Sequence, residues 1–203
     1  MGNILNLIKK GFSSPFEAIE YILSLLRGYL LVRYWNATGR KVIVGRKFKV
    51  SGRVAVKGPG TIVLGDNVLL TGTMNSVCTL FTSATDARIE IGSNTVLNGS
   101  RFGCMQRIAI GEGCLIGDAR IADNDGHSIR KDRRSVSGSE LTAKPVLLAD
   151  NVWIGAGVFI LKGVKIGKNS VVGSGAVVIG NIPENAYALG NPARVMGALP
   201  GEM

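Results

Sequence analysis

A six-residue repeat dominates the C-terminal half of this 203-residue chain and limits the folds open to it. From Leu148 to Val178 an aliphatic residue recurs at every sixth position, and a small residue often follows it directly. A period of six fits neither the 3.6-residue period of a helix nor the alternation of a simple strand. It fits short flat strands joined by tight corners, each hexapeptide forming one face of a triangular column. The repeat therefore predicts an all-β solenoid with aliphatic side chains inside and small residues at its corners.

The same phase is present earlier, at Ile110, Ile116 and Ala122, and in weaker form from Val44 onward. It slips between residues 51 and 63 and between 71 and 88, which predicts irregular first coils. A further break separates Ala122 from Leu148, 26 positions later. Either one full coil with a few extra residues lies there, or fewer coil residues and a longer insertion. Its polar, basic content predicts a loop extruded near 128–145.

The N-terminal part lacks the repeat and carries the signals of a helix. Ser14, Pro15 and Glu17 form a capping box with proline at the first helical position. Apolar residues follow at helical spacing from Phe16 to Leu30, so we expect one amphipathic helix. Two roles are open to this helix: it covers the exposed end of the solenoid, or it lies on a membrane surface through residues 15–35. Glu20 favours the first role, because an acidic residue dilutes the basic face that would bind an anionic membrane. The expected organisation is a helical cap or anchor at 1–40, a β-helix domain at 41–184 and a tail at 185–203.

Composition limits the cellular compartments and the classes of binding partner that we expect for this protein. Lys and Arg number 24 against 14 Asp and Glu, a formal charge of +10, which suits nucleic acid, an anionic membrane or a phosphate-rich ligand. No recognition motif for nucleic acid is present, so we expect no such partner. The three Cys form no CxxC pair and the chain has one His, which predicts neither disulfides nor a metal site. The N-terminus makes a poor signal peptide, and we expect a cytoplasmic protein, with the inner face of the membrane as an alternative.

Two segments resemble a known family. The first resembles the hexapeptide-repeat acyltransferases and reads VWIGAGVFILKGVKIGKNSVVGSGAVVIGNIPENAYALGNPARVMG. The second resembles the catalytic-histidine region of the sugar and polysaccharide O-acetyltransferase branch of that family and reads IADNDGHSI. The resemblance is strong over 89–197, faint over 41–88 and absent before that. It implies a left-handed parallel β-helix, assembly as a homotrimer, and acetyl-CoA as co-substrate.

His127 is the candidate catalytic base. It lies where the loop is expected to leave the solenoid, with Asp125 and Asp123 two and four residues before it. In extended backbone these three side chains share a face, so either carboxylate is a candidate to orient the imidazole. The resemblance implies that His127 removes the proton of an acceptor hydroxyl, which then attacks the thioester directly in a ternary complex. Cys104 and Cys114 fall at small inward or corner positions and are expected to be structural.

Other residues are assigned to the acyl donor by the resemblance. Ala156 and Ser174 lie 18 residues apart at equivalent corners, where family members use backbone N–H groups to bind the thioester carbonyl and the pantetheine arm. Trp153 matches a tryptophan that flanks the thioester. Arg194, with Lys162 in support, matches a basic residue near the CoA phosphates. The chain departs from several relatives here, because it has Gly180-Asn181 where they carry a lysine before Ile-Pro.

The acceptor side has three candidates: Asn98 by resemblance, and Arg130 and Arg133 in the basic loop as ligands for an anionic group. The predicted function is acetyl-CoA-dependent O-acetylation of a saccharide hydroxyl in a surface polysaccharide or lipid-linked glycan. The alternatives are an N-acetyltransferase for a nucleotide-linked amino sugar and a non-catalytic solenoid scaffold.

Overall fold

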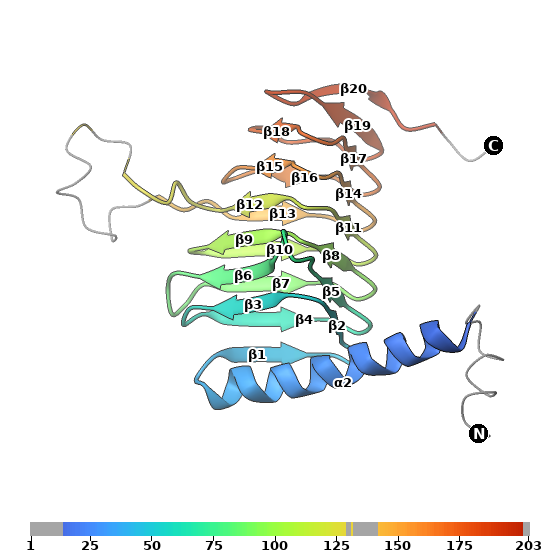
Figure 1. Ribbon diagram of the computed structural model, residues 1–203. Helices are drawn as coiled ribbons and strands as arrows, with labels where there is room; N and C mark the ends of the chain where they lie inside the picture. Colours follow the sequence, from blue (N-terminus) through green and yellow to red (C-terminus); the bar gives the residue numbers. More distant parts are fainter. Residues whose placement is uncertain (1–13, 129–130, 132–141, 201–203) are drawn as a thin grey trace.

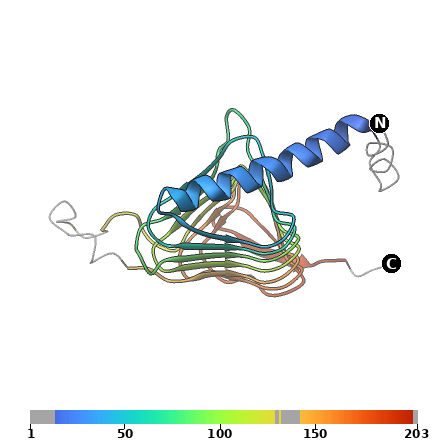
Figure 2. The same ribbon diagram turned by 90° about the horizontal axis from the view of Figure 1, so that it is seen from below.

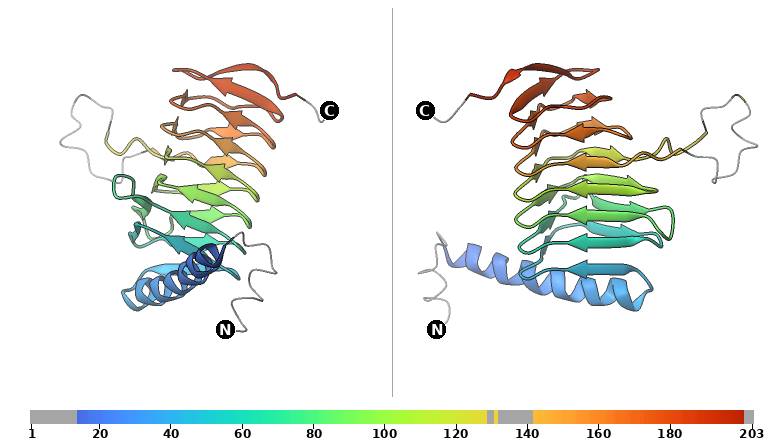
Figure 3. Two further views of the ribbon diagram at one scale, coloured as in Figure 1. Left: turned by 45° about the vertical axis from the view of Figure 1, so that its right-hand side comes forward. Right: turned by 180° about the vertical axis from the view of Figure 1, so that it is seen from behind.

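The hexapeptides form short strands that stack into three sheets, one on each face of a triangular column (Figures 1 and 2). The computed structural model describes residues 14–128, 131 and 142–200. Neighbouring strands within each sheet are parallel except for β19 and β20 at the C-terminal end. Successive coils therefore lie one above another, and Figure 3 shows the same stacking from two further sides.

The first face, sheet A, contains in spatial order β1 (Lys41–Val44), β4 (Thr61–Leu64), β7 (Arg88–Ile91), β10 (Arg107–Ile110), β13 (Val146–Leu148) and β16 (Lys165–Ile166). Sheet B contains β2 (Lys49–Ser51), β5 (Leu69–Thr71), β8 (Val96–Asn98), β11 (Leu115–Ile116), β14 (Trp153–Ile154), β17 (Val171–Val172), β19 (Ala186–Leu189) and β20 (Arg194–Ala198). Sheet C contains β3 (Val54–Lys57), β6 (Cys78–Thr82), β9 (Arg101–Cys104), β12 (Arg120–Ala122), β15 (Phe159–Ile160) and β18 (Val177–Val178).

The aliphatic positions of the repeat form the core, as predicted. Ile154, Ile160 and Val172 are fully buried, and the same inward rows continue through the earlier coils. One position of the predicted phase is wrong: Ile121, not Ala122, points inward and pairs with Ile160. The corner after Ile116 has three residues instead of four, which brings the next inward position forward by one.

The break in the six-residue repeat between Ala122 and Leu148 lies within a single corner of the column. Because Ile110 pairs directly with Leu148, β10 and β13 are adjacent and no extra coil separates them. Of the two interpretations of this break, the structure supports fewer coil residues and a longer insertion. Asn124 and Ala143 form an antiparallel bridge where the chain leaves and re-enters the column. Residues 129–130 and 132–141 of the predicted loop lie outside the described residues.

The predicted N-terminal helix is present as α2 (Pro15–Ala37), which crosses the lower end of the column (Figure 2). Ser14 caps it, since its Oγ accepts a hydrogen bond from the Glu17 backbone N–H at 3.2 Å. At the other end, β19 and β20 lie beyond residue 184, so the column extends into the predicted tail. Among the described residues, no helix is long and apolar enough to cross a membrane.

The covered face of α2 differs from what the apolar spacing suggests. The buried residues are Ala18, Ser24, Gly28 and Trp35, whereas the apolar residues from Phe16 to Leu30 are mostly exposed. Small side chains let the helix approach β2 closely: a Cβ on Gly28 would lie 2.7 Å from the Phe48 carbonyl oxygen. The helix thus covers the open end of the column and still presents an apolar outer face.

Candidate active site

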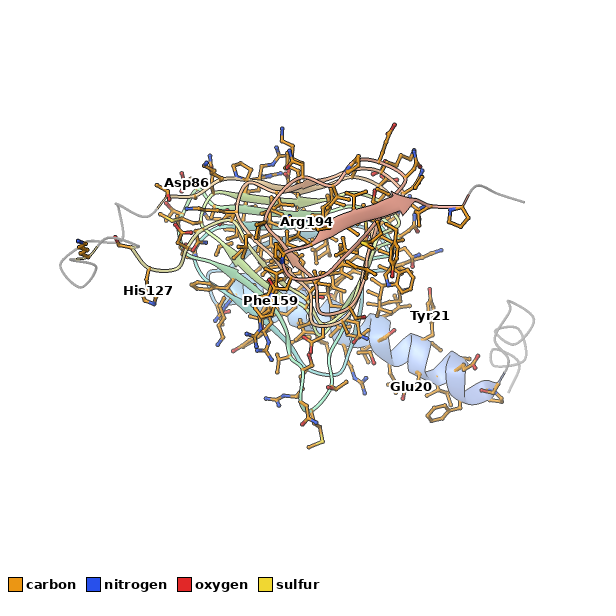
Figure 4. All side chains as sticks on the ribbon, turned by 90° about the horizontal axis from the view of Figure 1, so that it is seen from above. Glu20, Tyr21, Asp86, His127, Phe159 and Arg194 are labelled. Carbon is orange, nitrogen blue, oxygen red and sulfur yellow. The ribbon has the colours of Figure 1, made fainter. Side chains whose placement is uncertain are left out.

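His127 is exposed at the corner between sheets C and A, five residues after β12 ends. Figure 4 shows its side chain pointing away from the column. The backbone there is not extended, because Gly126 has a φ of +71° and donates its N–H to the Asn124 side chain at 2.9 Å. The expectation that Asp123, Asp125 and His127 share one face therefore fails: Asp123 is buried, while the other two are exposed.

Asp123 holds the corner together. Its Oδ1 accepts the Met105 N–H, and its Oδ2 accepts those of Gln106 and Arg107, each at 2.7 Å. The Asn124 side chain donates to Oδ1 as well, at 2.9 Å. Both carboxylate oxygens therefore connect two corners of the column. One corner leads to His127, and the other belongs to the coil below it.

Asp125 lies at the surface and forms an ion pair with Lys162 on the next coil. The Lys162 ammonium also donates to the Thr142 hydroxyl at 2.7 Å. These contacts join the two ends of the insertion to the column. They also engage Lys162 at the corner that carries Asp125, away from the C-terminal coil that carries Arg194 on β20.

Asn98 and Trp153 lie together on the outer side of sheet B. Trp153 is 55% exposed, and with Asn98, Leu115 and Gly117 it lines a shallow groove of about 220 Å³. Asn98 is already engaged, since its Oδ1 accepts the Thr71 hydroxyl at 2.8 Å. Because sheet B lies opposite the corner between sheets C and A, one chain does not bring this groove to His127.

Ala156 and Ser174 lie at the corner between sheets B and C, one coil apart. Both residues are exposed, and within the described residues no acceptor takes either backbone N–H. Two N–H groups are therefore available to an external carbonyl along this edge of the column. Arg130 and Arg133, the predicted acceptor ligands, lie outside the described residues.

The cysteine thiols are unsuited to nucleophilic catalysis. Cys78, Cys104 and Cys114 are all buried and unpaired. Burial raises the pKa of Cys78 and of Cys104 to about 12, and it raises the pKa of Cys114 as well. The reactive thiolate is therefore scarce at neutral pH. The part of the chain that the structure describes contains no group of three or more His, Cys, Asp or Glu positioned to hold a metal ion.

One feature near His127 was missed from the sequence. Arg101 and Arg120, 19 residues apart, each directly precede an inward residue and lie side by side on the outer face of sheet C. The sequence did indicate that both arginines face outward, because the residue before an inward position points to the other side of the strand. The unequal coil lengths hid the fact that the two arginines are neighbours.

The stacked triangular coils define a parallel β-helix, and comparison with known proteins identifies its type. Residues 145–180 match the family "Bacterial transferase hexapeptide (six repeats)". The solved Vibrio cholerae hexapeptide-repeat acetyltransferase VCA0836, complexed with acetyl-CoA, is 24% identical, with a TM-score of 0.52 over 94% of this chain and 92% of that chain. A mutant of the Bacillus cereus N-acyltransferase AntD, complexed with dTDP-4-amino-4,6-dideoxyglucose and coenzyme A, is 19% identical, with a TM-score of 0.58 over 84% and 89%.

Curated relatives agree with this result. The Saccharomyces cerevisiae protein YJL218W is 46% identical over 115 residues, 53% of this chain and 57% of that protein. Galactoside O-acetyltransferase of Lactococcus lactis is 41% identical over 88 residues, 43% of this chain and 42% of that enzyme. The matches span about half the length of these relatives. Residues 145–180 thus match the hexapeptide repeats of bacterial transferases, and the predicted left-handed β-helix is confirmed.

Proposed function

We propose that this protein is an acetyl-CoA-dependent O-acetyltransferase that acts on a saccharide hydroxyl of a surface polysaccharide or lipid-linked glycan. The observation that carries the proposal is the exposed position of His127, the single imidazole of the chain, at the corner where the insertion interrupts the column. The match of residues 145–180 to transferase repeats and the relative named as a galactoside O-acetyltransferase support it.

In this mechanism the His127 imidazole takes the proton of the acceptor hydroxyl as its oxygen attacks the thioester carbonyl. The carbon–sulfur bond then breaks, and the imidazolium returns the proton to the leaving thiolate of CoA. The free N–H groups at Ala156 and Ser174 are suited to the thioester oxygen as negative charge develops on it. Trp153 would flank the thioester, and Arg194 would meet the CoA phosphates.

Of the two candidate carboxylates we assign the orienting role to Asp125. It is exposed at the same corner as His127, whereas both oxygens of Asp123 accept hydrogen bonds from other groups. Lys162 holds Asp125 in place through their ion pair, so we assign Lys162 to this corner in preference to the CoA phosphates. Asn98 is retained as an acceptor ligand in the groove of sheet B.

The separation of these groups supports a homotrimer with sites between chains. His127 lies at the corner between sheets C and A, while Trp153 and Asn98 lie on the opposite face. A neighbouring chain placed around a three-fold axis would bring its own Trp153 and Ser174 toward His127. Each site would then use two chains.

Replacing the base tests the function. We expect His127→Ala to fold normally and to lose about 10²–10⁴-fold in the rate of CoA release from acetyl-CoA with a galactoside acceptor. Glu112→Gln, an exposed change at the corner between sheets A and B, is the matched control. Unchanged turnover in His127→Ala, or no turnover in the natural protein with any saccharide, would favour the scaffold alternative.

Transfer to an amine is the second candidate function, favoured by the AntD structure with its bound amino sugar nucleotide. The two are separated by assaying a hydroxy sugar and the matching amino sugar side by side. Acetylation of the amine alone would contradict O-transfer.

We further propose that the protein works in the cytoplasm at the membrane surface, which it contacts through residues 15–35. The outer face of α2 supports this, because its large apolar side chains are between 45% and 70% exposed: Phe16, Ile19, Ile22, Leu26, Tyr29, Leu30 and Tyr34. A helix that is apolar on the side away from its own domain needs something to cover it.

The distribution of charge favours an anionic bilayer as that cover. Residues 21–65, which form most of α2 and the first coil, contain nine basic and no acidic residues. Residues 66–203 contain 13 basic and 12 acidic residues, so nearly all of the net charge lies at the helix end of the column. Apolar side chains among cationic ones are the pattern of an interfacial helix on anionic lipid.

A further inference from the structure

Sheet C carries a shallow groove of about 300 Å³ at the level of β9, β12 and β15. Gly103 and Ala122 are neighbours on its floor, and Phe159 and Leu161 stand beside them with their side chains partly exposed. A Cβ added to Gly103 would meet only the Ala122 methyl group, at 3.9 Å. No steric constraint therefore requires glycine at this position, and its absent side chain leaves the groove open.

Two unneutralised arginines line this groove. Arg101 and Arg120 are register partners on adjacent parallel strands, about 5 Å apart at their backbones. Within the described residues neither guanidinium forms an ion pair, although Arg120 lies over the Phe159 ring at 5.2 Å. Like charges on adjacent strands repel each other, so this arrangement favours binding of an anion.

Sheet A provides an internal comparison. Arg88 and Arg107 are register partners in the same way, but Glu90 lies between them and accepts a hydrogen bond from each, at 2.7 and 2.8 Å. The Arg88 hydrogen bond and then that of Arg107 hold the pKa of Glu90 below its ordinary value. Within the part of the chain that the structure describes, the column thus neutralises one arginine pair with its own carboxylate and leaves the other pair without one.

The groove lies beside the candidate base. β12 ends at Ala122, on the groove floor, and the chain reaches His127 five residues later. Figure 4 shows His127 and Phe159 on the same side of the column. A ligand whose anionic group meets the arginines would extend along the groove toward the corner that carries His127.

We propose that this groove is the part of the acceptor site that holds a charged group, and that the acceptor is an acidic saccharide. Its carboxylate or phosphate would be held by the guanidinium groups of Arg101 and Arg120, and its ring would pack on Phe159 above the Gly103 floor. The inference rests on the proposed transferase function and defines its substrate class: a saccharide that carries one negative charge near the hydroxyl to be acetylated.

The test is a binding titration on the CoA-free protein, followed by NMR, with methyl glucuronide, methyl glucoside and glucose 1-phosphate. We expect at least one anionic probe to bind about tenfold or more tightly than the glucoside, as suits a charge-assisted contact. Preference for the glucuronide identifies a carboxylate, and preference for the phosphate ester identifies a phosphate. The variant Arg101→Gln/Arg120→Gln should lose this preference, whereas Arg88→Gln/Arg107→Gln, with the same change in charge, should keep it.

Equal binding of all three probes, or equal loss in both double variants, would overturn the proposal. So would displacement of the glucuronide by CoA alone, which would assign the arginines to the donor. CoA release from acetyl-CoA is measured separately in the same variants, with a neutral galactoside and with methyl glucuronide. Absence of activity with both acceptors in the natural protein would count against the transferase, whereas the binding result concerns the groove alone.

Discussion

Asp123 shows how a residue selected for chemistry can turn out to be structural. Its position four residues before His127 made it a candidate orienting group. The structure instead buries it fully and directs its oxygens to the N–H groups of residues 105–107. Those groups lie 16 to 18 residues earlier in the chain, one coil below. A spacing argument limited to neighbouring residues could not detect them.

We therefore expect Asp123→Asn to destabilise the fold. The amide would place an NH₂ group against backbone donors, and the buried N–H groups would lose a charged acceptor, at a cost of about 2–4 kcal/mol. Chemical denaturation would measure the difference in the free energy of unfolding. Asp118→Asn, at an exposed corner, should change it by less than about 0.5 kcal/mol. Equal stability of the two variants would show that the Asp123 contacts contribute little.

At the scale of elements, α2 is the segment where sequence and structure differ most. Capping signals placed its start correctly, because a cap depends on residues three positions apart. The apolar spacing did not reveal the buried face. That face was decided by Gly28 and Ser24, whose small side chains allow close approach to β2, and by Trp35 at the far end. A helix apolar on two sides has no single face that its sequence can identify.

The exposed side of α2 leads to a prediction on lipid binding. Vesicles of phosphatidylcholine with phosphatidylglycerol should bind the full chain, and vesicles of phosphatidylcholine alone should bind it much more weakly. Ile22→Ser/Leu26→Ser should reduce sedimentation with the anionic vesicles by about tenfold or more, because two apolar anchors are lost.

The matched control is Ile179→Ser, a change at a similarly exposed residue near the opposite end of the column. High salt should weaken binding because it screens the basic residues. Equal binding to neutral and anionic vesicles, or equal loss in the control, would contradict the proposed membrane contact.

At the scale of the whole molecule, the candidate site is divided. His127 lies at one corner, the free N–H groups of Ala156 and Ser174 at another, and Trp153 on the face opposite His127. A rigid column cannot bend to bring these together, because its coils are joined by continuous sheets. A site that uses all of them requires a second copy of the chain.

Mixing of inactive variants tests this arrangement. His127→Ala and Trp153→Ala/Asn98→Ala chains, co-expressed in equal amounts, should recover about a quarter of the natural activity if each site takes its residues from two chains of a trimer. Co-expression of His127→Ala with Asp125→Ala, which lie at the same corner, should recover none. Light scattering should give the mass of three chains. A monomeric mass, or no recovery in the first mixture, would contradict a site shared between chains.

The fold could be predicted from the sequence because a hexapeptide coil is specified by residues that are close together in the chain. Each inward residue lies six positions from the next, and each corner needs only a small residue beside it, so the periodicity defined the column from Leu148 to Val178. The position of His127 at an interruption of that period could be recognised for the same reason. Tertiary structure alone decided which side of α2 is covered, where the carboxylate of Asp123 points, and that Arg101 and Arg120 are adjacent. These contacts join residues on different coils or elements, and because the coils differ in length, sequence spacing does not specify which side chains meet.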